Sequence, residues 1–196
     1  MFIKNLINTT LHSMTEHMRY SGAHVINKEN VAEHSYYVTL LADMIAEDIL
    51  QKNPTISINK LKVLQMALYH DTEEAFTGDL ITPVKNKSKE LKKEWDKLSF
   101  QMMREGLEQD FPEQQHIYKY IISIHEEYEK YKYEDLENQI VKFADGLQSI
   151  IYLLREKAYG NTHVLPILTN VISSLQKIFA HNTIFSYYLS SLEEFT

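Results

Sequence analysis

Four ionisable side chains interrupt otherwise apolar stretches of the sequence: His34, His70, Asp71 and Asp145. His70 and Asp71 are adjacent at the end of an apolar segment, and Asp145 interrupts the largely apolar segment 141–147. Burying a carboxylate costs on the order of several kcal/mol unless a cation or hydrogen-bond donors compensate it. Two imidazoles and two carboxylates form a mixed nitrogen and oxygen ligand set, which suits a borderline or hard divalent ion and leaves positions open for water and substrate.

Each of these residues also has a structural interpretation when it is taken alone. A histidine on an apolar helical stripe, such as His34, is more often a hydrogen-bonded core residue than a ligand, and Asp145 could lie on a helix surface. His125 is a further candidate ligand, but one histidine does not define a second centre, and we predict a mononuclear site. The other histidines lack a partner pattern and are expected at the surface or at helix ends: His12, His17, His24, His116, His163 and His181.

Composition limits the class of protein. The chain has 196 residues, of which 44% are hydrophobic and 24% charged, as in ordinary globular domains. The net charge is −7 and the densest basic stretch, 85–97, is interleaved with acids, which argues against a nucleic-acid polymer as partner. The absence of cysteine excludes disulfides and thiolate metal sites. No apolar run approaches the roughly 18 residues that span a bilayer, and we predict a cytoplasmic protein without a membrane partner.

The elements that must position these residues are predicted to be helices. Five glycines and four prolines are few, and no segment shows a sustained period of two. Asn30 can cap a helix that carries His34 on its apolar stripe. Further helical stripes run through 57–74, 91–102, 117–128, 136–154 and 164–179. The sequence therefore predicts an all-α fold.

The second of these helices leads directly into a shaped loop. It can begin at Ser57 or Asn59, and its stripe extends through His70 to Glu74. In residues 77–83, a glycine permits positive φ and a proline disfavours the helical conformation of the residue before it. Loops that are anchored on rigid helices often carry function.

The order His…His-Asp…Asp resembles the HD-domain phosphohydrolases, an all-α superfamily in which these four side chains bind a catalytic metal. Longer segments are more specific. Residues 30–35 (NVAEHS) resemble the first-histidine helix, and 69–85 (YHDTEEAFTGDLITPVK) resemble the His-Asp helix and loop of the YfbR-type 5'-deoxynucleotidases. Residues 141–147 (VKFADGL) resemble the final-aspartate helix. We interpret residues 1–196 as one HD-domain helical bundle, with the motifs at about 19–154 and C-terminal helices, which carry no recognised motif, at about 163–195.

This resemblance implies an activity and a cofactor. The expected reaction is hydrolysis of deoxyribonucleoside 5'-monophosphates to deoxynucleoside and phosphate. The expected cofactor is one divalent ion (Co, Mn, Zn, Ni, Fe or Mg) held by His34, His70, Asp71 and Asp145. The subfamily also suggests a homodimer.

In the subfamily, an arginine followed by a large aromatic residue, usually Trp, precedes the first metal histidine by some fifteen positions. Arg19 and Tyr20 stand at that spacing before His34. Arg19, helped by Lys85, can neutralise a phosphate, since a guanidinium forms two parallel hydrogen bonds. Tyr20 is interpreted as a pocket wall that bears on selectivity for sugar and phosphate number.

Carboxylates beyond the His-Asp pair are assigned to the chemistry. Glu74 lies four residues after His70, so it can reach a water activated by the metal, and the resemblance makes it the acid–base group. The resemblance makes Asp79 a substrate-positioning group near the sugar hydroxyl or leaving oxygen. Thr82 is expected to shape the sugar pocket, and Glu73 is expected to be exposed.

The four metal positions do not distinguish one phosphate ester from another. Alternatives are a deoxynucleoside triphosphate triphosphohydrolase, a cyclic nucleotide hydrolase and an alarmone hydrolase. A non-catalytic nucleotide-binding module is an alternative from another class, against which the four ligands and Glu74 argue. Residues 19–20 and 78–85 favour monophosphates.

Overall fold

The computed structural model describes residues 2–80, 87–131 and 133–195. Within these ranges every regular element is helical, apart from an isolated antiparallel bridge between Met18 and Asn30. The all-α prediction is confirmed. In chain order the helices are α1 (Phe2–Asn8), η1 (Thr10–Thr15), α2 (Val31–Lys52), α3 (Lys60–Tyr69), α4 (Glu74–Thr77), α6 (Lys89–Asp110), α7 (Gln115–Tyr131), α8 (Leu136–Ala158), η2 (Thr162–Val164), α9 (Leu165–Phe179), α10 (Ser186–Leu192) and η3 (Glu193–Phe195).

Side-chain caps set the starts of the helices that lead to the site. The Asn30 side chain accepts a hydrogen bond from the Glu33 backbone, and the Glu33 carboxylate accepts one from the Asn30 backbone. Asn59 at the start of α3 and Ser88 at the start of α6 each make a single cap, in which the side chain accepts a hydrogen bond from the backbone N–H three residues later. Of the two predicted starts for α3, the structure has Asn59. Each cap satisfies an N–H group that has no partner within its own helix.

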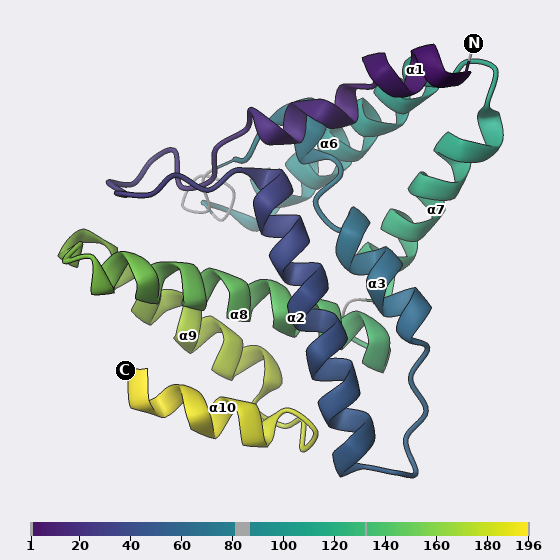
Figure 1. The fold of residues 1–196 in the computed structure, drawn as a ribbon. Helices are drawn as coiled ribbons and strands as arrows, with labels where there is room; N and C mark the ends of the chain where they lie inside the picture. Colours follow the sequence, from purple (N-terminus) through teal and green to yellow (C-terminus); the bar gives the residue numbers. More distant parts are fainter. Residues whose placement is uncertain (1, 81–86, 132, 196) are drawn as a thin grey trace.

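Two hydrophobic clusters hold the helices together (Figure 1). The larger joins α2, α3, α8, α9 and α10, and the smaller joins α6 to α7, which contributes to both. Phe143 on α8 and Met103 on α6 are fully buried representatives of the two clusters. Burying such a side chain contributes about 1.5–3 kcal/mol. Because α2 packs against both α3 and α8, residues from these three helices can meet in one place.

The predicted helix through Glu74 is interrupted. α3 ends at Tyr69, residues 71–73 form turns, and the short helix α4 begins at Glu74. The backbone N–H of Thr72 donates to the Tyr69 carbonyl at 3.3 Å and that of Glu74 to the Asp71 carbonyl at 3.0 Å, which is the i→i−3 pattern of turns and not that of an α-helix. The prediction of one continuous stripe from α3 to Glu74 was therefore wrong, and α4 is positioned by its own contacts.

Those contacts come from α6 and η1. Phe76 of α4 lies where a side chain on Gly106 of α6 would be, so the missing Cβ permits the close approach. The Ser13 hydroxyl of η1 donates to the Ala75 carbonyl. Packing on two sides fixes the direction in which Glu74 points.

Candidate metal centre and active site

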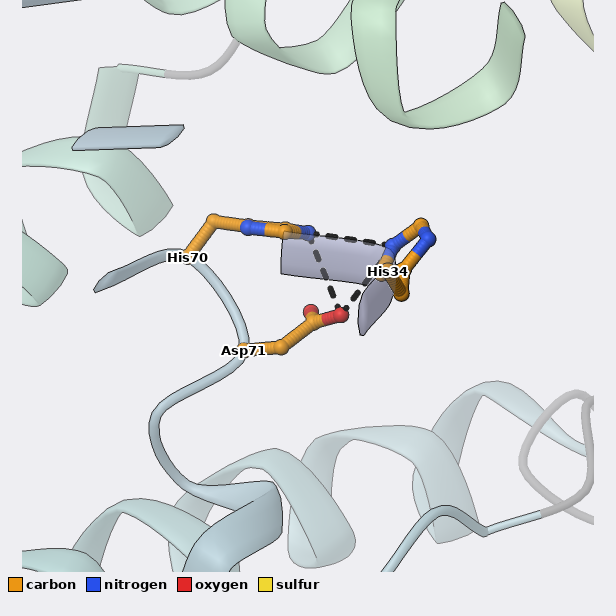
Figure 2. Close-up of side chains that lie close together, drawn as sticks. All are labelled: His34, His70 and Asp71. Carbon is orange, nitrogen blue, oxygen red and sulfur yellow. Dashed lines mark hydrogen bonds and ion pairs between the residues drawn. The ribbon is translucent and has the colours of Figure 1, made fainter. Parts of the chain in front are cut away.

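The four predicted ligands come together where α2, the end of α3 and the middle of α8 meet. His34 Nε2 lies 3.3 Å from His70 Nε2 and 3.4 Å from Asp71 Oδ2, and His70 Nε2 lies 3.1 Å from the same oxygen (Figure 2). Asp145 Oδ1 approaches from α8 to 3.3 Å from His34 Nε2. Both histidines are buried, and the two carboxylates are about one-fifth exposed.

Hydrogen bonds on the far sides of the rings orient both imidazoles. His70 Nδ1 donates to the Ala67 carbonyl at 2.8 Å. The Gln148 amide nitrogen donates to Glu29, so the amide oxygen faces His34 and accepts from Nδ1 at 2.7 Å. This pattern assigns the Nδ1–H tautomer to both rings and directs two Nε2 lone pairs toward each other. At 3.3 Å they repel unless a positive charge lies between them.

The donor set fits a divalent cation. His34, His70 and Asp71 each offer one ligand atom, and these atoms lie within 4.8 Å of one another. Neighbouring ligand atoms at about 2.0–2.2 Å from one metal ion are about 2.8–3.6 Å apart, with the octahedral arrangement at the low end and the tetrahedral one at the high end. The separations of 3.1–3.4 Å in the cluster match that spacing. With Asp145, two carboxylates balance the double positive charge.

The charged groups of the cluster shift one another's pKa values. Burial opposes the imidazolium, yet the Asp71 carboxylate raises the pKa of His70 to about 9. Burial and the nearby Arg19 lower the pKa of His34. Although burial opposes ionisation, the histidines lower the pKa of Asp71, and Lys142 together with His34 lowers the pKa of Asp145. The carboxylates stay ionised, as metal ligands must be.

A cavity of about 1150 Å³ opens beside the cluster, which is large enough for a nucleotide. Its walls are polar near the cluster and apolar along α9, where Ile167, Val171 and Ile178 line it. Of the predicted substrate residues, Arg19, Tyr20 and Asp79 line the cavity. Thr82 and Lys85 lie outside the described residues.

Glu74 is a half-buried residue that lines the cavity. Its Oε2 atom is buried and has no hydrogen-bond partner among the described residues. Burial, together with repulsion from Asp71 and Asp79, raises the pKa of Glu74 well above its ordinary value. Burial also raises the pKa of Asp79. A cavity-lining carboxyl that retains its proton can donate it to a leaving group.

Glu73 is mostly buried, whereas the sequence led us to expect an exposed side chain. Its side chain is 14% exposed, and its Oε2 accepts a hydrogen bond at 2.6 Å from Nε2 of His125, which is itself buried. The His125 ring stacks on Phe100 of α6, and both rings line the cavity. The only sequence signal for this pairing is the position of His125 on the apolar stripe of α7, four residues after Ile121.

Arg19 takes part in a network that the sequence did not predict. Its Nη1 donates to Glu29 at 2.9 Å and to Gln148 at 3.2 Å, and its Nη2 donates to Ser149 at 3.3 Å. Nη1 also lies 2.6 Å from His34 Nδ1, but its two hydrogens are accepted by Glu29 and Gln148. Gln148 and Ser149 could have been found by spacing, because they follow Asp145 by one helical turn.

Tyr20 adopts positive φ (57°), an uncommon conformation for a bulky residue. Its ring stacks on Tyr152 of α8 with centroids 4.9 Å apart, and the Arg19 guanidinium lies 5.3 Å from the ring centre. The Tyr152 hydroxyl donates to the Asn27 carbonyl, and Glu156 accepts from the backbone N–H groups of residues 26 and 27. These contacts hold the loop 16–30 against α8.

No helix in the described ranges is both long and apolar enough to cross a membrane.

Comparison with known proteins agrees with this geometry. The model of a family described as 5'-deoxynucleotidase YfbR-like matches residues 7–194. The 5'-deoxynucleotidase YfbR of Escherichia coli O127:H6 is 32% identical over 77% of this chain and 72% of its own length. An HD-domain phosphohydrolase from Listeria innocua superposes with a TM-score of 0.70 at 21% identity, covering 94% of this chain and 90% of its own. The cyanophage S-2L HD phosphohydrolase DatZ, bound to dA and one catalytic Zn²⁺ ion, superposes with a TM-score of 0.65 at 16% identity, covering 95% and 96%.

Proposed function

The chain belongs to the YfbR-like 5'-deoxynucleotidase family, and from this premise we propose that it hydrolyses deoxyribonucleoside 5'-monophosphates to deoxynucleoside and phosphate. The observation that carries the proposal is the convergence of two Nδ1-protonated imidazoles and two ionised carboxylates beside a nucleotide-sized cavity. The deoxynucleoside bound to the cyanophage enzyme supports the substrate class.

The proposed cofactor is one divalent cation held by His34, His70, Asp71 and Asp145. Zinc in the cyanophage enzyme supports this assignment, and Co, Mn, Ni, Fe and Mg are also compatible with the ligand types. Such an ion supplies Lewis acidity at the phosphoryl group and activates a water as nucleophile. The hydrogen bonds of the two Nδ1 atoms turn both Nε2 atoms toward the proposed cation site.

The other residues around the cation have separate roles in proton transfer and in substrate binding. Glu74, whose pKa is raised, delivers a proton to the leaving oxygen of the sugar. Asp79 accepts a hydrogen bond from the sugar and positions it. Arg19 keeps its guanidinium at the cavity wall, where its charge attracts the phosphate. Tyr20, held by its stack on Tyr152, limits the space beside the sugar and phosphate.

The test is a phosphate-release screen of nucleoside mono-, di- and triphosphates in deoxy and ribo forms against several divalent metals. We expect kcat/KM to be higher for dAMP than for AMP or dATP. Preference for dATP would reject the monophosphate proposal and leave the metal site standing. Absence of metal-stimulated phosphate release from any nucleotide would favour a binding module.

The variant Tyr20→Ala tests whether the Tyr20 ring sets the preference for the deoxy sugar. Loss of the ring opens space beside the sugar, so the ratio of kcat/KM for dAMP to that for AMP should fall by about tenfold, the low end of what pocket shape contributes to discrimination. Tyr159→Ala is the matched control, because Tyr159 is 65% exposed at the end of α8 and does not line the cavity. An unchanged ratio in Tyr20→Ala would show that this ring does not set selectivity.

The proposal also covers the domain organisation, the localisation and the oligomeric state of the protein. We take residues 1–196 as one domain, which the match over residues 7–194 and the packing of α9 on α8 support. We also propose a cytoplasmic homodimer. Tyr36, Leu40 and Met44 form an exposed apolar stripe on α2, which supports self-association. Light scattering of Leu40→Lys should show a monomer if α2 forms the interface, while a wild-type monomer would reject the dimer.

A further inference from the structure

Lys142 is a cation of the site that the proposed mechanism does not use. It lies on α8 one turn before Asp145, and its Nζ donates to Asp145 Oδ2 at 2.7 Å. The other oxygen of that carboxylate, Oδ1, faces His34 Nε2. The ammonium is therefore separated from the metal-facing atoms by the width of one carboxylate. It also lines the same cavity as Arg19 and Glu74.

The carboxylates around the cavity favour a role for the Lys142 ammonium in binding a negatively charged substrate. A phosphate monoester carries two negative charges, and Asp71, Glu73, Glu74 and Asp79 line the same walls. Arg19, which attracts the phosphate in the proposed function, also forms an ion pair with Glu29 at 2.9 Å, so it divides its charge between that carboxylate and the substrate. Lys92, Lys97, Lys130 and Lys142 also line the cavity, and Lys142 is the lysine that is held against a proposed metal ligand, so its positive charge lies where a metal-bound phosphate would be.

We propose that Lys142 binds the substrate phosphoryl group beside the metal, while its contact with Asp145 orients the ammonium toward the cavity. The inference rests on the proposed function. A cation held through Asp145 Oδ1 competes for the charge of that carboxylate and weakens its hold on Lys142. An ammonium has three donors on a flexible stem, so it can keep Asp145 Oδ2 and also donate to a phosphoryl oxygen. The side chain is 25% exposed, so it is accessible from the cavity.

The competing interpretation is that Lys142 only orients Asp145 as a ligand. Three variants of the metal-loaded enzyme distinguish phosphate binding by Lys142 from orientation of Asp145: Lys142→Met, Lys142→Gln and Lys142→Arg. Calorimetry measures the Kd of inorganic phosphate at saturating metal and, separately, the Kd of the metal without phosphate. Steady-state kinetics with dAMP gives kcat and KM. Lys142→Gln retains a donor toward Asp145 and guards against loss of folding in Lys142→Met.

If Lys142 contacts phosphate, Lys142→Met and Lys142→Gln should weaken phosphate binding by about ten- to a hundredfold and raise KM for dAMP in parallel. Lys142→Arg should retain most of both affinities, because it keeps the charge. The matched control is Lys62→Met. Lys62 has a side chain 23% exposed and an ion pair with Glu127 at 2.8 Å, but it lies outside the cavity. This control should match the wild type in phosphate affinity.

Unchanged phosphate affinity in metal-saturated Lys142→Gln would overturn the inference, even if the metal itself bound more weakly. An equal loss in Lys62→Met would also overturn it, since the effect would then be one of overall charge. Failure of the proposed function gives a different result: the wild type would release no phosphate from any nucleotide. Binding of inorganic phosphate would still test Lys142 in that case.

Discussion

Two groups of carboxylates line the cavity, and their pKa values are shifted in opposite directions. On the α3 and α8 side, Asp71 and Asp145 contact imidazoles and an ammonium, and their pKa values are lowered. On the α4 side, Glu74 and Asp79 are half-buried with weaker compensation, and their pKa values are raised. The same side-chain chemistry thus yields ligands in one region and proton-retaining groups in the other.

The difference follows from the elements that carry the residues. His34 and Asp145 lie on long helices and Asp71 lies just after the end of α3, and nearby residues supply their partners, as Lys142 does for Asp145. Glu74 begins a four-residue helix that is held by the packing of Phe76, and this packing directs the carboxyl into the cavity without a donor. A hydrolase needs both kinds of carboxylate, since one must hold a cation and the other must move a proton.

Removing a carboxylate from the metal side should have the largest effect. Asp145→Ala should abolish bound metal and turnover together, because it leaves two imidazoles and one carboxylate around the cation. Metal content by atomic absorption and phosphate release with dAMP measure the two losses, and circular dichroism checks the fold. Full metal occupancy in the folded variant would show that Asp145 is not an essential ligand.

Removing the acid on the α4 side should separate chemistry from binding. Glu74→Ala should keep its metal and its affinity for substrate but lose about 10²–10⁴-fold in kcat, the usual contribution of a general acid–base group. Metal content, substrate Kd and kcat are measured on one preparation. Loss of metal from this variant would make Glu74 a ligand and remove the contrast between the two regions.

A smaller effect is expected at the second α4-side position. Asp79→Asn should retain metal and reduce kcat/KM for dAMP by about ten- to a hundredfold, since it loses a charged hydrogen-bond acceptor for the sugar. Asp43→Asn is a suitable control, because Asp43 pairs with Lys60 on the surface far from the cavity lining. If Asp79→Asn matched this control, Asp79 would have no role in positioning the substrate.

The smallest expected effect is a change in the pH dependence of the free energy of unfolding. With a chelator present, the free energy of unfolding of the wild type minus that of Glu74→Gln should fall as pH rises above the ordinary glutamate value of 4.5. A raised folded-state pKa means that the folded state binds more protons than the unfolded state in this window, so stability decreases with pH. Subtracting the Gln variant removes the similar trend of His70, whose pKa is about 9. A difference that is flat or rises with pH would contradict the raised pKa.

Much of the fold could be predicted from the sequence because its determinants are local. The Asn30 cap and the 3.6-residue spacing define α2, and the scarcity of glycine and proline indicates long helices. The ligand set was also visible, since His70 and Asp71 are adjacent and Asp145 interrupts an apolar helix. That these residues converge follows from the HD-domain resemblance, which the family match confirms.

Other features of the site depend on contacts that no local pattern contains. Glu73 pairs with His125 across 52 positions of sequence, and Arg19 reaches Gln148 across 129. The break after Tyr69 was hidden because apolar periodicity continues through it, while the backbone hydrogen bonds of Thr72 and Glu74 change to the i→i−3 pattern of turns.

The sequence by itself determined the ligand types, the helical class and the family of this protein, because residue identity and helical period act over a few positions. Only the tertiary structure decided which carboxylates are paired and which are left without a partner. The pKa of Glu74 depends on its depth of burial and on Asp71 and Asp79 nearby, and that depth is set where Phe76 packs over Gly106. Charge compensation is a property of three-dimensional proximity, so it appears only once the helices are packed.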